Sequence, residues 1–248
     1  MLLEVGNVTT EVIMTPYEFS HQLELLHQGE LESVVLYGSA VSSDFSKKLS
    51  DYNIIVILKD PSPVKLARSQ KLVKKWVGKG NPPPLFFDPT HIERSLDVFP
   101  LEFLDISDRH QVLLGEDPFK NIHVELTNLR HQCESELKGK LLTLRSLYSI
   151  HCNKPRLVAD LMLKTFSGFL SVFKGVLHLL NEKPDKAPEK IIEQLIKHLD
   201  FNLDIFFDII LVKNGKRILP RKTDALVAFE KYLMAIEEIT DFVDRMEE

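Results

Sequence analysis

The sequence predicts an α+β fold, in which a small mixed-sheet domain at residues 1–118 precedes an all-α antiparallel helical bundle at residues 119–248. Residues 15–118 alternate short apolar runs with helical patterns, which is typical of a mixed α/β domain. Beyond them, apolar residues recur at steps of three and four, as on one face of long helices. Charge changes at the same point, from an acidic excess to near balance. We therefore place a domain boundary near Gly115–Pro118.

The first part begins with a clear helix signal. Thr15 is a favourable N-cap, and Pro16 and Glu18 suit a first helical turn, so a helix is expected to about residue 28. The apolar runs 33–37 and 52–58 predict strands, the second buried on both faces and therefore central. Further along we expect a helix at 63–78, a strand at 85–87, a short helix after Thr90 and a strand at 101–106.

The second part consists of long helical patterns separated by prolines and one Asn-Gly pair. Proline suits the first turn of a helix and is rare in its interior, so these residues mark the boundaries. Four helices are expected, at about 119–150, 155–181, 188–213 and from 223 to the C-terminus. The third is expected to bend near 200–202. Long helices with short links form a bundle.

Composition excludes several classes of protein. The 248 residues are 44% hydrophobic and 27% charged, enough to bury a core without disulfides or structural metals. The net charge of -5 argues against a general nucleic-acid binder. Cys133 and Cys152 form neither a disulfide framework nor a zinc pattern, which favours a reducing, cytoplasmic setting. The N-terminus lacks a signal-peptide pattern, and the most apolar stretch, 157–180, holds three charged residues, so we expect no membrane span.

The segment that contains a candidate functional motif runs from Leu36 to Leu58, LYGSAVSSDFSKKLSDYNIIVIL. A strand ends at Gly38-Ser39, and a loop of small and polar residues leads to the next strand. Glycine lets backbone approach a phosphate closely, and successive N–H groups there could form an anion-binding nest. Asp51 and Asn53 are two residues apart at the strand, so their side chains should share one face. Hard oxygen ligands there suit Mg²⁺ carrying a triphosphate.

This pattern resembles the nucleotidyltransferase superfamily related to DNA polymerase beta. Its members have an apolar residue, Gly, then Gly or Ser, a loop, and Asp-x-Asp or Asp-x-Glu; here Tyr37, Gly38 and Ser39 are followed by Asp51 and Asn53. The order of elements resembles the minimal and kanamycin-type members, which join a small α/β domain to a helical bundle. The resemblance implies an NTP held by Gly38 and Ser39, with Mg²⁺, or Mn²⁺ in its place, held by Asp51 and Asn53.

The resemblance also implies a third carboxylate on a later strand. The segment VFPLEFLDI supplies Glu102 and Asp105. Glu102 is favoured because it lies inside the apolar run, where a charge needs a reason. It would complete the metal site or accept the proton of the acceptor hydroxyl. Asp105 remains the alternative, since it would face the other side of a strand.

Asn53 departs from the family pattern, because an amide can ligate Mg²⁺ but adds no charge. Two hypotheses follow. The chain is a Mg²⁺-dependent enzyme that moves a nucleoside monophosphate from an NTP to a hydroxyl of a small molecule or protein, with Asp51 and Glu102 as catalytic residues. Alternatively, it is a catalytically impaired protein of the same fold that binds a nucleotide or a protein partner. The sequence leaves the oligomeric state open, a homo-oligomer included.

Two basic segments could be either solvent-exposed helix faces or binding surfaces. The helix expected at 63–79 carries six Lys and Arg residues and no acid, and a solvated face is favoured over a nucleic-acid contact. On the long helix, Arg130, Lys138 and Arg145 follow roughly one stripe. They would line the mouth of the cleft, or form a solvent-facing stripe paired with Glu134 and Glu136.

Overall fold

The computed structural model describes residues 14–41, 51–216 and 222–246. The predicted α+β fold class is confirmed: a mixed sheet lies in the first part and the rest is mainly helical. The chain forms two compact units. The sheet unit comprises Met1–Arg94 and Ile106–Ile122, and the helical unit comprises Ser95–Asp105 and His123–Glu248. Residues 95–105 thus belong with the helices although they precede the last strand.

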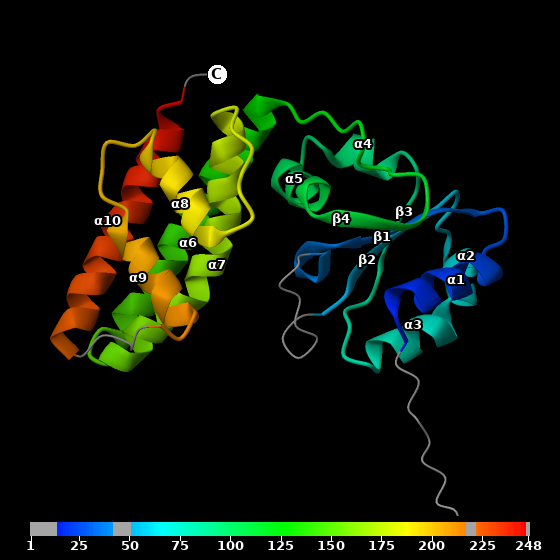
Figure 1. The fold of residues 1–248 in the computed structure, drawn as a ribbon, viewed down its shortest axis with the longest axis horizontal. Coiled ribbons are helices and arrows are strands. Elements are labelled where there is room, and N and C mark those ends of the chain that lie inside the picture. Colours follow the sequence, from blue (N-terminus) through cyan, green and yellow to red (C-terminus); the bar gives the residue numbers. More distant parts are fainter. Residues whose placement is uncertain (1–13, 42–50, 217–221, 247–248) are drawn as a thin grey trace, which may run out of the picture. The chain divides into compact units, whose positions relative to one another are not determined.

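Four strands form one mixed sheet with the order β3-β2-β1-β4 (Figure 1). The two inner strands are β1 and β2. Strand β1 pairs antiparallel with β2 and β4, and β2 pairs parallel with β3. The predicted strands at 33–37, 52–58 and 85–87 are confirmed, and the second of them is central. The observed strands are β1 (Leu31–Tyr37), β2 (Asn53–Leu58), β3 (Leu85–Phe87) and β4 (His110–Gly115).

Three helices contribute the core on one face of the sheet. They are α1 (Pro16–Leu26), α2 (Pro63–Arg68) and α3 (Gln70–Val77). Phe19 of α1 and Trp76 of α3 are fully buried in one cluster with alternate residues of β1 and β2. The predicted cap of α1 is confirmed: Glu18 donates its N–H to the Thr15 hydroxyl, and its carboxylate accepts from the Thr15 N–H at 2.8 Å.

The strand predicted at 101–106 is wrong. After the short helix α4 (His91–Ser95), these residues form helix α5 (Pro100–Asp108), and the strand follows as β4, which the sequence analysis did not expect. The N–H of Leu101 donates to Oε1 of Gln132 at 2.8 Å, and Leu104 packs on the core of the helical unit. Apolar residues at 101 and 104 serve one face of a helix, which a short apolar run does not distinguish from a strand.

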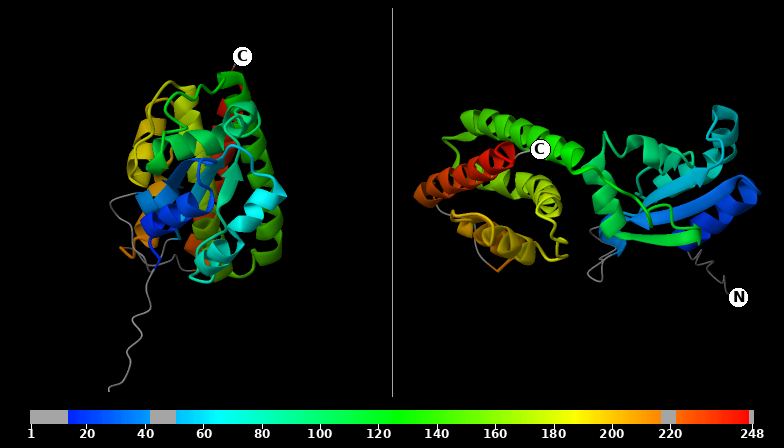
Figure 2. Two further views of the ribbon diagram at one scale, coloured as in Figure 1. Left: turned by 90° about the vertical axis from the view of Figure 1, so that its right-hand side faces the viewer. Right: turned by 90° about the horizontal axis from the view of Figure 1, so that it is seen from above.

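The helical unit is built on three mutually packed helices (Figure 2). These are α6 (Leu126–His151), α7 (Pro155–Leu179) and α10 (Lys222–Asp244), with α8 (Pro188–Ile196) and α9 (Asp204–Lys213) packed on α7. The helix expected from 119 begins at Leu126. The one expected at 188–213 is two helices, α8 and α9, and residues 197–203 between them include the predicted bend at 200–202. No described helix combines the length and apolar character needed to cross a bilayer.

Candidate functional site

The two halves of the Gly-Ser and Asp-x-Asn motif meet at the end of β1. Tyr37, the last residue of β1, lies opposite Asn53, the first residue of β2. Gly38 follows with φ of +80°, a conformation that L side chains rarely adopt. A Cβ on Gly38 would lie 3.4 Å from Nδ2 of Asn53. Glycine therefore brings the turn directly against the side chain that departs from the family pattern.

The backbone N–H of Gly38 is already used. It donates to the carbonyl of Arg109, just before β4, at 3.0 Å. Gly38 thus anchors the end of β1 to β4. Its contribution to the predicted site would be the space left by its missing Cβ. The predicted nest of N–H groups would have to lie further along the chain. The next N–H groups belong to the 3₁₀ turn Gly38–Val41, which contains Ser39.

Strand pairing sets the face of the candidate residues. Asn53, Tyr37 and His110 lie opposite one another across β2, β1 and β4, and directly opposed residues share a face. Tyr52 packs with the α3 cluster, its ring centroid 6.1 Å from that of Trp76. Because side chains alternate along an extended chain, Asn53 points to the opposite face. Burial raises the pKa of Tyr37 above its usual value near 10.

Asp51, which precedes β2, and Ser39 are exposed, whereas Asn53 is half-buried. The alternation that turns Asn53 away from α3 favours the same side for Asp51, and that shared face stays a prediction. Residues 42–50 of the motif loop lie outside the described residues. An exposed carboxylate beside a half-buried amide leaves room for a ligand with its own oxygen atoms.

His110 is a residue of this region that the sequence analysis missed, because β4 was not expected. Its Nε2 lies 3.0 Å from Oδ1 of Asp117, and its Nδ1 lies 2.9 Å from the carbonyl of Ser107. The ring meets Phe119 edge-on, with centroids 5.2 Å apart. Both ring nitrogens thus have partners within the sheet unit, and His110 secures the start of β4.

The assignment of Glu102 rested on a strand that does not exist. Glu102 is exposed on α5, in the helical unit, and its Oε2 accepts from Nε2 of Gln132 at 2.7 Å. The alternative, Asp105, accepts from Lys174 of α7, whose side chain is almost fully buried. Both carboxylates therefore have structural partners that hold α5 on the bundle. A role for Glu102 as third carboxylate stays a prediction.

No set of three or more His, Cys, Asp or Glu side chains within the described ranges is arranged to hold a metal ion. Asp51 and Asn53 nevertheless provide two oxygen donors of the type that Mg²⁺ accepts. Mg²⁺ commonly binds through one or two carboxylates together with substrate phosphates. The residues therefore fit an ion that arrives with a nucleotide, in contrast to a protein site that is complete by itself.

The stripe on α6 forms ion pairs inside the helical unit. Arg130 and Lys138 pair with Glu134 at 3.1 and 2.6 Å. Lys138 also reaches Asp244 of α10, and Arg145 reaches Glu237 at 2.6 Å. The interpretation in which the stripe pairs with nearby acids is thus confirmed for Glu134. The further partners of Lys138 and Arg145 lie on α10. A position at a cleft mouth stays a prediction.

The basic segment 63–79 forms α2 and α3, broken at Ser69. Leu72 and Trp76 point into the sheet core, while Lys74 and Lys75 are exposed. This arrangement is the solvated face that the sequence favoured.

The chain matches no protein-family model and no curated protein sequence. Among solved structures, it is similar to spectinomycin adenyltransferase AAD(9) from Enterococcus faecialis, determined with ATP and spectinomycin. The two chains share 10% identity at a TM-score of 0.40, over 90% of this chain and 100% of the other. This likeness is too distant to assign an activity, which depends on the residues of the chain itself.

Proposed function

We propose that the sheet unit binds an NTP at the adjoining ends of β1 and β2 and transfers its nucleoside monophosphate to a hydroxyl group. The acceptor belongs to a small molecule or to a protein side chain. One observation carries the proposal: Gly38, in its left-handed conformation, lies against Asn53, although a loop of more than ten residues separates them in sequence.

Each residue of the proposed site has a distinct role. Gly38 removes side-chain bulk where the phosphates approach, and the hydroxyl of Ser39 provides a donor to a phosphate oxygen. Asp51 and Asn53 would hold Mg²⁺ or Mn²⁺ through a carboxylate and an amide oxygen. The bound ion would offset the negative charge of the triphosphate. Glu102 is left outside this set, since its supporting strand is absent.

In the proposed reaction, the acceptor oxygen forms a bond to the α-phosphorus and the bond between that phosphorus and the pyrophosphate oxygen breaks. The proton of the acceptor hydroxyl passes to solvent water, and pyrophosphate leaves. Most of the catalysis in such a transfer comes from positioning and from charge stabilisation. Strand pairing fixes Asn53 directly and Gly38 through the adjacent Tyr37. Ser39 and Asp51 are their close neighbours in sequence.

A second function is favoured by Asn53 itself. With one carboxylate beside an amide, the site has less negative charge than a pair of carboxylates, and the described residues contain no third acid grouped with them. Nucleotide binding without transfer is the outcome expected if a single weakly held ion does not suffice. The acceptor would then be absent, and the bound nucleotide would serve recognition.

The two functions are separated by titrating each of the four NTPs with Mg²⁺ or Mn²⁺ and measuring both heat and pyrophosphate. Asp51→Asn should weaken metal-dependent binding by about tenfold or more, since it removes the carboxylate. Asn53→Asp should strengthen it, because a second carboxylate adds charge to the ion's ligands. Glu32→Gln is the matched control, since this exposed carboxylate lies at the other end of β1.

Pyrophosphate release that disappears in Asp51→Asn supports the transferase. Binding without pyrophosphate, across hydroxyl acceptors of both classes, supports the second function. Equal metal affinity in wild type, Asp51→Asn and Asn53→Asp would contradict both functions, because Asp51 and Asn53 would then hold no ion.

A further inference from the structure

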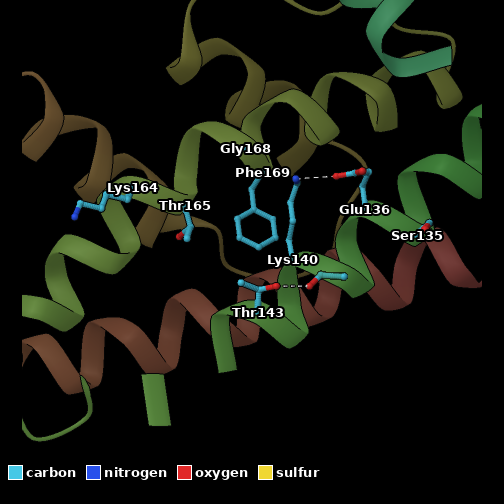
Figure 3. A pocket seen from close by; sticks show the side chains of 9 residues that line it. Ser135, Glu136, Lys140, Thr143, Lys164, Thr165, Gly168 and Phe169 are labelled. Atoms are coloured by element: carbon cyan, nitrogen blue, oxygen red, sulfur yellow. Dashed lines mark hydrogen bonds and ion pairs between the residues drawn. The ribbon is translucent and has the colours of Figure 1, made fainter. Parts of the chain in front are cut away.

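An open groove of about 560 Å³ lies between α6 and α7 in the helical unit (Figure 3). Small-molecule sites commonly have volumes of roughly 300–1,000 Å³. Phe169 lies beneath the groove with its side chain fully buried, and Lys140 runs from α6 towards Gly168. The other lining residues are polar or small: Ser135, Glu136, Gly139, Thr143, Lys164 and Thr165.

Two helix-interior glycines beside the groove have no packing reason. Glycine is the poorest helix former after proline, so its presence inside a helix calls for a cause. At Gly175 of α7 the cause is contact, since a Cβ would lie 2.2 Å from Leu101 and 2.8 Å from Cys133. At Gly139 a Cβ would meet nothing within 4 Å, and at Gly168 it would meet only Lys140, at 3.7 Å. These two glycines keep the groove open.

The threonine hydroxyls of the groove have no hydrogen left to donate to a ligand, so its charged groups decide what it can bind. Thr143 and Thr165 donate their hydroxyl hydrogens to carbonyls of their own helices, at 3.0 and 2.8 Å. Lys140 pairs with Glu136 at 2.7 Å, which neutralises the single carboxylate of the lining. Within the described residues, Lys164 has no ion-pair or hydrogen-bond partner. The lining therefore carries one excess positive charge and an uncommitted ammonium group.

We propose that this groove binds a small organic anion, with an apolar body and one carboxylate or phosphate group. The body would lie between the two glycines. The Lys164 side chain is exposed and points away from Phe169 in Figure 3, so it would turn towards the groove to bind the anionic group. The same group would draw Lys140 partly away from Glu136. Cations would be repelled, and neutral molecules of equal size would gain only the apolar contact. The site lies wholly within the helical unit and does not depend on nucleotide binding by the sheet unit.

The test uses the full chain labelled with ¹⁵N-glycine, so that the amide signals of the groove glycines report binding. The probes are phenyl phosphate and benzoate, with neutral benzyl alcohol and cationic benzylamine for comparison. We expect saturable shifts of the Gly139 and Gly168 signals with both anions, while Gly29 of the sheet unit stays unchanged. The anions should bind about threefold to fivefold more tightly than benzyl alcohol, and benzylamine should bind least.

Three variants locate the site. Lys164→Ala should weaken anion binding about threefold to fivefold, whereas Lys231→Ala, an exposed lysine of α10, should leave it unchanged. Gly139→Leu should abolish binding, because it fills the groove while leucine favours the helix. Absence of saturable shifts with either anion overturns the proposal. So does equal affinity for benzyl alcohol, or anion binding that survives Gly139→Leu.

Discussion

The sheet unit and the helical unit create their candidate sites in different ways. In the sheet unit, backbone pairing at strand ends brings Gly38 and Asn53 together. In the helical unit, missing side chains at Gly139 and Gly168 leave space between two helices. The first kind of site follows a local sequence motif. The second depends on which faces of distant helices meet, so no motif signals it.

The two units also bury polar groups differently. His27 is fully buried in the sheet unit, with Nε2 of its ring 2.5 Å from the hydroxyl of Ser69. Its Nδ1 is buried without a hydrogen-bond partner. The helical unit instead buries the ammonium group of Lys174 against Asp105. The sheet unit thus depends on a neutral histidine, and the helical unit on a charged pair.

The largest expected effect tests whether the two cores are independent. Phe206 is fully buried among Phe166, Phe173 and Tyr232, and Phe206→Ala should lower the free energy of unfolding of the helical unit by about 3–5 kcal/mol. Trp76 is the single tryptophan and lies in the separate core of the sheet unit. Urea unfolding is followed by circular dichroism for helix content and by Trp76 fluorescence. The first transition should shift and the second should not. A common shift would show that the units unfold as one.

A smaller effect sharpens the contrast among glycines. Gly175→Ala should destabilise the helical unit by about 1–3 kcal/mol, because the added methyl overlaps Leu101 and Cys133. The measurement is the same urea transition by circular dichroism. Leu101→Ala in the Gly175→Ala background should recover part of the loss, since it removes the nearest atom. No recovery would place the clash at Cys133.

The buried histidine predicts a pH dependence of the sheet unit. Burial, helped by nearby Arg68, lowers the pKa of His27 below its usual value near 6.5. The unfolded chain therefore binds the proton more readily, so stability is lost as pH falls below about 6.5 towards the folded-state pKa. The slope cannot exceed about 1.4 kcal/mol per pH unit for one group. Trp76 fluorescence in urea at several pH values measures it. His27→Gln, which stays neutral and keeps a donor or acceptor near Ser69, should flatten this dependence; an unchanged slope would assign it to other groups.

Local signals were sufficient for much of the fold. The Thr15 cap, the proline that opens α7 and the apolar run of β2 each depend on a few adjacent residues, and all are found in the structure. The same holds for the meeting of Gly38 and Asn53, since a strand, a turn and a second strand bring them together. These features could be predicted because their energetics lie within a short stretch of chain.

Long-range contacts account for the failures. The residues 101–106 form a helix whose polar side chains bond to Gln132 and Lys174 on other helices, and no local pattern reveals those partners. The break between α2 and α3 falls at Ser69, whose hydroxyl meets the buried His27 at the C-terminal end of α1. Glu102 was therefore assigned to a site on a wrong element, and the α6–α7 groove was not foreseen at all.

The smallest expected effect concerns Gly139 and has the opposite sign. Gly139→Ala should stabilise the helical unit by about 0.5–1 kcal/mol, because alanine favours a helix and the new methyl meets no neighbour within 4 Å. The urea transition by circular dichroism measures the gain. If the groove binds an organic anion, the same methyl enters the binding space, so stability should rise while affinity for phenyl phosphate falls. Gly175→Ala provides the contrast, since a glycine held by packing loses stability on the same change. A loss of stability in Gly139→Ala would mean that the groove is narrower than the structure shows, and the glycine would then be explained by packing alone.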